Sequence, residues 1–533
     1  ENTLADKTEE CSFQPEPTGA PPVSEPTPSQ PFPLTDRPAA FILTQTLVWY
    51  LMIVIAKPFL DKYGDMVEVY AWSQHFLMGS NKHPQFLPWM AHLWFAVMPR
   101  TVASFYALAA INLGVAFAGI YALGRALGLS RGVALAAVAL EALAFPYLTL
   151  ADKLNMNAIL LPTWPWTAWA FARALNGETG RQRLIGGVLF GLMAAIAMMS
   201  KYYSALLLAT LLIATLLPGT RKVWSGIAPW AGLAAFALAI APHLAWQIHH
   251  HFETFTYAED QGTGFDGYHF LTFVLLPIYY WILPWPAALI LFYRGPFLAR
   301  VTRSLRMQGK GDVLWLMAFG PYLMSLFAGI VGFVFLSEPW GIPIGFAFTL
   351  LWLRNADPDR IAADSARLMG AFRYIWPGMI LLGAVFAFGA GRNGDRAFYY
   401  PERQAALKIG AEWQRIAPGQ RLYWVASGND AARVAYFARL PQRVEALPGL
   451  PDALPDYYPP VKDWQAKAGL IICPLGAGTD IAKEDDCTRV AEHWSTVNGH
   501  AIHDFRFAEA RKGFTFPRHE PFAFAAFFYI PPK

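Results

Sequence analysis

Long apolar runs recur along most of this chain and limit the folds available to it. A helix needs about 20 apolar residues to cross about 30 Å of hydrocarbon. Runs near that length occur at about 38–57, 102–124, 131–149, 155–175, 183–200, 203–217, 226–247, 270–293, 313–335, 338–353 and 374–391. Only 15% of the residues are charged, against roughly 25% in soluble domains. The sequence therefore predicts an all-α polytopic membrane protein with about eleven transmembrane helices.

The basic residues between these runs predict the orientation. With the N-terminus in the cytoplasm, every cytoplasmic loop after the first 36 residues is basic, as the positive-inside rule requires. These loops contain Arg125, Arg131, Arg173, Arg181, Arg183, Arg221, Lys222, Arg294, Arg300, Arg303, Arg306, Lys310, Arg354, Arg360, Arg367 and Arg373. The net charge of +4 is small and scattered, which argues against nucleic acid as a partner.

Three regions of different composition define the expected domains. Residues 1–36 are polar and rich in proline, so we expect a disordered cytoplasmic tail. Residues 37–391 form the transmembrane domain. Its long outer loop at 58–101 is too polar to cross the membrane and contains an apolar helix expected over 86–98. Residues 392–533 alternate strand-like runs, such as Phe522–Ile530, with helical ones. This pattern predicts a small periplasmic α/β domain.

Two of the three cysteines, Cys473 and Cys487, lie in this last region. Their spacing fits no zinc-binding pattern. In an oxidising compartment a disulfide between them is the expected outcome.

The outer loop holds charged residues among aromatic ones, which is costly beside a membrane and often marks function. Asp65 begins a helix expected over 65–78, where it could simply be an N-terminal cap. Glu68 lies on the same helical face, and Lys82 and His83 follow in a short loop. A carboxylate near a basic pair suits a site where an acceptor loses a proton while an anionic group departs.

The string Asp65…Tyr-Ala-Trp72-Ser-Gln-His75, followed by His83-Pro84, resembles the first outer loop of bacterial family 39 glycosyltransferases. These are membrane enzymes of the GT-C architecture, related to protein O-mannosyltransferases and to the aminoarabinose transferase of lipid A. Weaker matches are the segments 191–202, 242–247 and 338–340. The chain departs from the family where Met66 replaces a second acid and Gln85 replaces a second proline.

The resemblance implies an inverting transfer of sugar from a polyprenyl-phosphate donor to a cell-envelope acceptor, such as lipid A, lipopolysaccharide or another glycolipid, at the periplasmic face of the inner membrane. Asp65 would be the general base. Lys82, His83 and Lys201 would contact the donor phosphate, although snorkelling to the interface is the other interpretation of Lys201. Substrate-binding roles fall to Glu68, Trp72 and Asp152.

The resemblance requires no cofactor and leaves open a divalent metal ion between Glu68 and His83. The alternative function is a transporter or flippase for a lipid or small solute. Transporters usually show related halves and ionisable residues near the membrane centre, whereas here the acids gather at one surface and no internal repeat is evident.

Overall fold

The computed structural model describes residues 37–531 apart from 62, 261–263, 293–295, 333–334, 357, 393–399, 427, 460–463, 465, 499–500 and 512–519. The tail expected over residues 1–36 lies outside the described residues.

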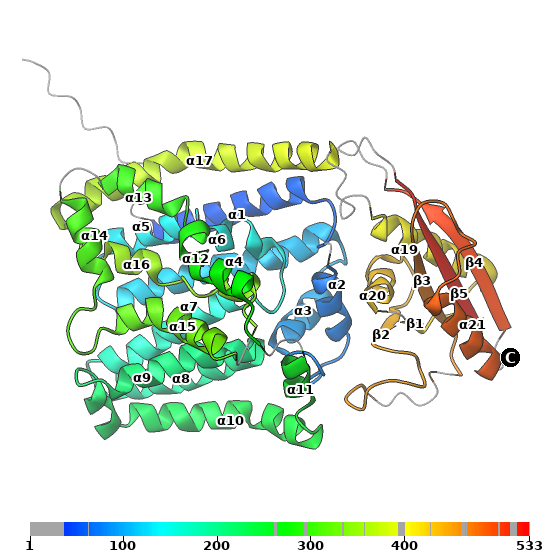
Figure 1. The fold of residues 1–533 in the computed structure, drawn as a ribbon, viewed down its shortest axis with the longest axis horizontal. Helices are drawn as coiled ribbons and strands as arrows, with labels where there is room; N and C mark the ends of the chain where they lie inside the picture. The colour runs from blue at the N-terminus through cyan, green and yellow to red at the C-terminus, as the bar shows by residue number, and fades with distance from the viewer. Residues whose placement is uncertain are drawn as a thin grey trace, which may run out of the picture.

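Most of the chain is a bundle of helices that run in roughly the same direction (Figure 1). Helices α1 and α17 lie along one edge of this bundle and α10 along the opposite edge (Figure 1). The helices of the bundle are α1 (Pro38–Ala56), α4 (Val102–Ala126), α5 (Arg131–Glu141), α6 (Phe145–Leu148), α7 (Leu160–Asn176), α8 (Gly180–Ser200), α9 (Ala205–Leu216), α10 (Ala228–His249), α12 (Gly267–Tyr280), α13 (Pro284–Phe292), α14 (Phe297–Leu305), α15 (Val313–Ile330), α16 (Phe348–Leu353) and α17 (Pro358–Arg392).

Within the described residues, seven helices are long and apolar enough to cross a membrane. They are α1, α4, α8, α10, the α12–α13 pair, α15 and α17. The apolar runs at 131–149, 155–175, 203–217 and 338–353 form shorter or broken helices instead. Proline and glycine explain two of the breaks, because Pro146 starts a new short helix and Gly341, Pro343 and Gly345 delay α16. The chain is a multi-pass membrane protein.

The outer loop carries two helices, α2 (Asp65–Trp72) and α3 (Phe86–Val97), which lie between the bundle and the C-terminal domain (Figure 1). The helix expected over 65–78 starts where predicted but ends six residues early. The side chain of Gln74 explains the early end, because it bonds to a strand of the C-terminal domain. Its amide nitrogen donates to Val444 O at 2.8 Å, and its amide oxygen accepts from Ala446 N at 2.7 Å.

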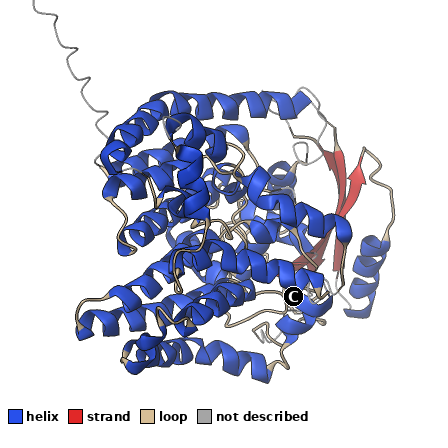
Figure 2. Ribbon diagram, turned by 60° about the vertical axis from the view of Figure 1, so that its left-hand side comes forward, coloured by secondary structure: helices blue, strands red, loops and turns tan. Residues whose placement is uncertain are grey.

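The C-terminal domain is a five-stranded mixed sheet with helices on both faces (Figure 2). The strand order is β2-β1-β3-β5-β4, with parallel pairs on the β2 side and antiparallel pairs on the β4 side. The strands are β1 (Trp424–Ala426), β2 (Glu445–Leu447), β3 (Gly469–Ala477), β4 (Ala501–Glu509) and β5 (Phe522–Ile530), and the helices are α19 (Glu402–Ile416), α20 (Gly428–Phe437) and α21 (Asp486–Asn498).

Burial on both faces explains why β5 is almost continuously apolar. Phe524 and Phe528 point to the core that is shared with α19, α20 and the membrane bundle. Phe527 and Tyr529, which alternate with them, point to a second core beneath α21. The domain is therefore packed against the bundle through one face of its sheet.

Contacts from the C-terminal domain hold the start of the outer loop. The buried carboxylate of Glu402 accepts a hydrogen bond from Leu60 N at 2.9 Å, and Asn429 Nδ2 donates to Tyr63 O at 3.0 Å. Gly64 has a positive φ of 84°, and a Cβ there would lie 2.3 Å from the Asn429 side chain. Only glycine satisfies both conditions. This anchored loop leads directly into α2 and fixes the place of Asp65.

Candidate active site

Asp61, not Asp65, caps the N-terminal end of α2. Its carboxylate accepts hydrogen bonds from Tyr63 N at 3.0 Å, Asp65 N at 3.2 Å and Met66 N at 2.7 Å. Three amide groups near the helix start are thus satisfied by one side chain. The simple capping role considered for Asp65 is therefore wrong, and its carboxylate is available for other contacts.

Asp65 contacts two residues of the segment between α6 and α7. Lys153 Nζ lies 2.8 Å from Asp65 Oδ2, and Asn155 Nδ2 donates to the same oxygen at 2.9 Å. The Asp65 side chain remains 33% exposed, so a substrate hydroxyl can reach it. The Asp65 carboxylate is therefore held by two side chains and remains accessible on one side.

Lys82 and His83 lie beside Trp72 in the loop that follows α2. Lys82 Nζ is 2.9 and 3.0 Å from the two carboxylate oxygens of Glu68 and 5.8 Å from the Trp72 ring centre. The His83 ring meets Trp72 edge-on at 5.8 Å. Glu68 and Trp72, expected as substrate-binding residues, thus contact the two basic residues directly.

Burial and neighbouring cations set the charge of this loop. Burial lowers the pKa of His83 well below its usual value, and Lys201 and Lys82 lower it further. His83 is therefore a neutral imidazole that can donate a hydrogen bond from one ring nitrogen. Burial also raises the pKa of Glu68, although the ammonium group of Lys82 acts in the opposite direction.

Lys201 follows the last residue of α8 and points toward this group. It donates to Asn157 Oδ1 and lies 4.9 Å from the Trp340 ring centre. Burial lowers the pKa of Lys201 to about 7, while nearby Asp65 raises it. These contacts face the interior of the site, so the snorkelling interpretation does not describe Lys201 in this structure.

A buried network joins the segments that carry the basic residues. His243, on α10, is bonded through Nδ1 to Met78 O at 2.7 Å and through Nε2 to the Tyr202 hydroxyl at 2.6 Å. Gln247 and Thr254 extend the network to Ser80 O. The network therefore ties the residue 78–83 loop to the Lys201–Tyr202 turn.

Asp152 lies in a separate contact at the edge of the site. It is buried and forms an ion pair with Lys57, just after α1. Burial raises the pKa of Asp152, while Lys57 lowers it. Asp152, Lys57, Asp61 and Lys153 all line a cavity of about 520 Å³.

Residues 82–246 match the family model described as dolichyl-phosphate-mannose-protein mannosyltransferase. Two crystal structures of ArnT from Cupriavidus metallidurans cover 91% of this chain and 97% of their own at 13% identity. Their TM-scores are 0.54 for the form bound to undecaprenyl phosphate and 0.53 for the apo form. The chain has an ArnT-like GT-C fold. No curated protein sequence matches it.

The resemblance to family 39 glycosyltransferases is thereby confirmed, as is the fold class of a helical membrane domain with a small C-terminal α/β domain. The sequence points to Asp152 but not to Lys153, Asn155 and Asn157 of the same segment, which contact Asp65 and Lys201. In Asp152-Lys-Leu-Asn-Met-Asn157, the four polar side chains contact Lys57, Asp65 and Lys201. The sequence signal for this segment is the occurrence of these four polar residues directly after a long apolar run.

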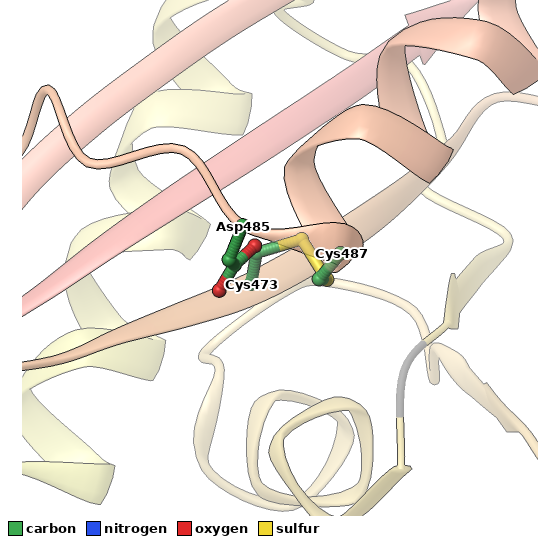
Figure 3. A group of neighbouring side chains, drawn as sticks. All are labelled: Cys473, Asp485 and Cys487. Atoms are coloured by element: carbon green, nitrogen blue, oxygen red, sulfur yellow. A yellow bond between two sulfur atoms is a disulfide. The ribbon is translucent and has the colours of Figure 1, made fainter.

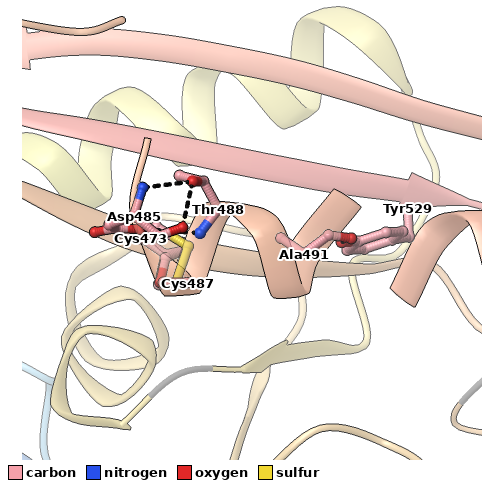
Figure 4. The surroundings of a disulfide bond; sticks show 7 residues. Cys473, Asp485, Cys487, Thr488, Ala491 and Tyr529 are labelled. Carbon is pink, nitrogen blue, oxygen red and sulfur yellow. Dashed lines mark hydrogen bonds between the residues drawn. A yellow bond between two sulfur atoms is a disulfide. The ribbon is translucent and has the colours of Figure 1, made fainter. Parts of the chain in front are cut away.

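One group of potential metal ligands occurs among the described residues, and it consists of Cys473, Asp485 and Cys487 (Figure 3). The two sulfur atoms are joined in a disulfide, so neither can bind a metal as a thiolate. The bond fastens β3 to the start of α21, where Asp485 and Thr488 exchange hydrogen bonds at 2.9 and 3.0 Å (Figure 4). This group is structural.

Proposed function

We propose that this chain is an integral-membrane inverting glycosyltransferase. It would move a sugar from a polyprenyl-phosphate donor to a cell-envelope acceptor, either lipid A or lipopolysaccharide or another glycolipid. The GT-C fold and the mannosyltransferase match over residues 82–246 support a membrane glycosyltransferase. The ArnT structure with undecaprenyl phosphate, itself a polyprenyl phosphate, supports the class of donor.

The observation that carries the proposal is the Asp65 carboxylate. It does not cap α2, it is partly exposed, and cations lie near it. In the reaction, the acceptor oxygen bonds to the anomeric carbon as the bond from that carbon to the phosphate oxygen breaks. The acceptor proton passes to Asp65, and the departing polyprenyl phosphate takes the electron pair. A single displacement of this kind inverts the anomeric centre.

The phosphate of the donor would lie among Lys82, His83 and Lys201. The two lysines supply positive charge. The neutral His83 supplies a hydrogen-bond donor without adding a third positive charge that would repel the lysines. Glu68 and Trp72 hold Lys82 in place through the contacts described above. Negative charge grows on the phosphate in the transition state, so these contacts strengthen during the reaction.

The site would face the periplasm from the inner membrane, with the N-terminus in the cytoplasm. Helix α14, which carries Arg300 and Arg303, lies at the end of the bundle opposite the C-terminal domain (Figure 1). Basic residues at that end suit the cytoplasm. The Cys473–Cys487 disulfide suits an oxidising compartment at the other end.

Replacing Asp65 by Asn tests the role of the carboxylate. Loss of a general base costs about 100- to 10,000-fold in rate, so transfer should fall by that factor while binding of undecaprenyl phosphate persists. Asp504→Asn, on the exposed β4 strand, is the matched control and should leave transfer unchanged. Mass spectrometry of envelope lipids, with and without the protein, identifies the sugar and the acceptor. Full activity of the Asp65 variant would refute the role.

A further inference from the structure

The cavity beside the site has one polar and one apolar end. Lys57, Asp61, Asp152, Lys153 and Glu338 contribute its charged groups. Its apolar lining includes Met52 and Ile53 of α1, Leu382 and Phe386 of α17, and Ile342, which lies between α15 and α16. Since α1 rises 1.5 Å per residue, Met52 and Ile53 lie about one to two turns deeper in the membrane than Lys57. The cavity therefore has the polarity of an amphiphile that stands in the outer leaflet.

The apolar end opens toward the surrounding lipid. Leu382 is 51% exposed and Phe386 is 48% exposed, although both line the cavity. A hydrocarbon chain could reach the cavity from the lipid past the exposed Leu382 and Phe386 of α17 without leaving the membrane.

The cavity adjoins Asp65 but does not include the three basic residues assigned to the donor phosphate. Lys153 and Asn155, which hold the Asp65 carboxylate, are part of the cavity wall. Lys82, His83 and Lys201 are not among the residues that line it. An in-line displacement requires the acceptor and the leaving phosphate on opposite sides of the anomeric carbon. A cavity that adjoins Asp65 and excludes the phosphate-binding residues is therefore available to the acceptor.

The charged residues at the polar end of the cavity favour one class of lipid headgroup over another. Three carboxylates, from Asp61, Asp152 and Glu338, face two ammonium groups, from Lys57 and Lys153. Both lysines are already paired, Lys57 with Asp152 and Lys153 with Asp65. A phosphorylated headgroup would meet excess negative charge, whereas a hydroxyl group can donate to the exposed carboxylate of Glu338.

We propose that this cavity is the acceptor site and that it binds an amphiphile with an uncharged, hydroxyl-bearing headgroup. The headgroup lies at the Asp61–Asp152 end, and the hydrocarbon chain lies against the cavity-lining residues of α1 and α17. This inference rests on the proposed transferase function and narrows its acceptor class from glycolipids in general to those without phosphate on the accepting headgroup.

Two adjacent leucines of α17 give a matched test of the site. Leu382 lines the cavity, whereas Leu381 is 65% exposed and does not line it. In nanodiscs with a donor of undecaprenyl-phosphate sugar, Leu382→Trp should raise the KM for a diacylglycerol glucoside about tenfold or more. Undecaprenyl phosphate binding should be unchanged. Leu381→Trp should behave like the wild type. Equal KM values for the two variants would overturn the assignment of the cavity.

A second measurement tests the choice of headgroup. The wild type should prefer the diacylglycerol glucoside over a bisphosphorylated glucosamine disaccharide lipid. Glu338 is exposed, so Glu338→Lys reverses a charge without burying it and should shift the ratio of kcat/KM toward the phosphorylated lipid about fivefold. A wild-type preference for the phosphorylated lipid would refute this inference alone. Wild-type protein that transfers sugar to neither lipid, nor to a total envelope lipid extract, would refute the transferase function itself.

Discussion

Glu402 links the C-terminal domain to the outer loop, and Glu402→Gln tests how much this link contributes. The Glu402 carboxylate accepts from Leu60 N and lies 3.4 Å from Arg433 and 3.7 Å from Arg511. All three charged side chains are nearly buried, with 5%, 11% and 6% exposed. Glutamine keeps the shape and the acceptor for Leu60 N but removes the negative charge between two guanidinium groups.

The expected loss of stability in Glu402→Gln follows from the burial of these charged side chains. Removing one partner of a buried ion pair costs about 3–5 kcal/mol. Arg433 retains a contact with Asp430 at 3.1 Å, so we expect the lower end, about 3 kcal/mol. At 1.36 kcal/mol per factor of ten, this corresponds to about a 150-fold increase in the unfolded population of the C-terminal domain, which holds the loop.

Hydrogen exchange at the Leu60 amide reports on this unfolding, because the amide stays bonded to residue 402 until the domain unfolds and releases the loop. We expect exchange about 150-fold faster in Glu402→Gln, together with slower sugar transfer, since Asp61 and Asp65 follow Leu60. The control is Glu509→Gln, which removes a more exposed pair with Lys408 at 3.3 Å and should cost about 0–1 kcal/mol. If both variants exchange at the same rate, the buried cluster does not hold the loop.

Two further predictions concern the charge at the donor site and the disulfide. Lys201 has a pKa lowered to about 7, so it is charged below that pH and loses its charge above it. A phosphodiester donor keeps its charge over this range, and donor affinity should be about tenfold weaker at pH 8 than at pH 6. Lys201→Arg, which stays protonated, should remove this pH dependence, and a variant that retains it would exclude Lys201 as the cause. Cys473 and Cys487 are separated by 14 positions, and closing a loop of that length contributes about 3 kcal/mol. Reduction should therefore lower the unfolding temperature of the C-terminal domain in a thermal scan, and an unchanged temperature after confirmed reduction would contradict this estimate.

Several elements could be read from local sequence because their signals are local. The starts of α2 at Asp65 and of α3 at Phe86 agree with the expected helices. Strand β5 spans Phe522–Ile530, as expected. Alternation and helical periodicity specify such elements before any long-range contact forms. The early end of α2 could not be read in this way, because it depends on Gln74 pairing with β2, about 370 residues away in sequence.

The number of membrane spans shows a similar limit. Apolar composition marks segments that avoid water, but it does not distinguish a helix that crosses the membrane from a shorter one buried among others. The run at 338–353 is as apolar as a span, yet α16 has only 6 residues, and all of them are buried inside the protein.

The sequence alone determined that the chain resides in a membrane, that its charged outer loop is exceptional, and that it resembles GT-C glycosyltransferases. Composition and short motifs carry that information, because the cost of charge in lipid acts on each residue separately. Only the tertiary structure decided that Asp61 caps α2, that Lys153 and Asn155 hold Asp65, and that an amphipathic cavity adjoins it. These facts depend on segments far apart in sequence, which meet only when the bundle and the C-terminal domain have packed together.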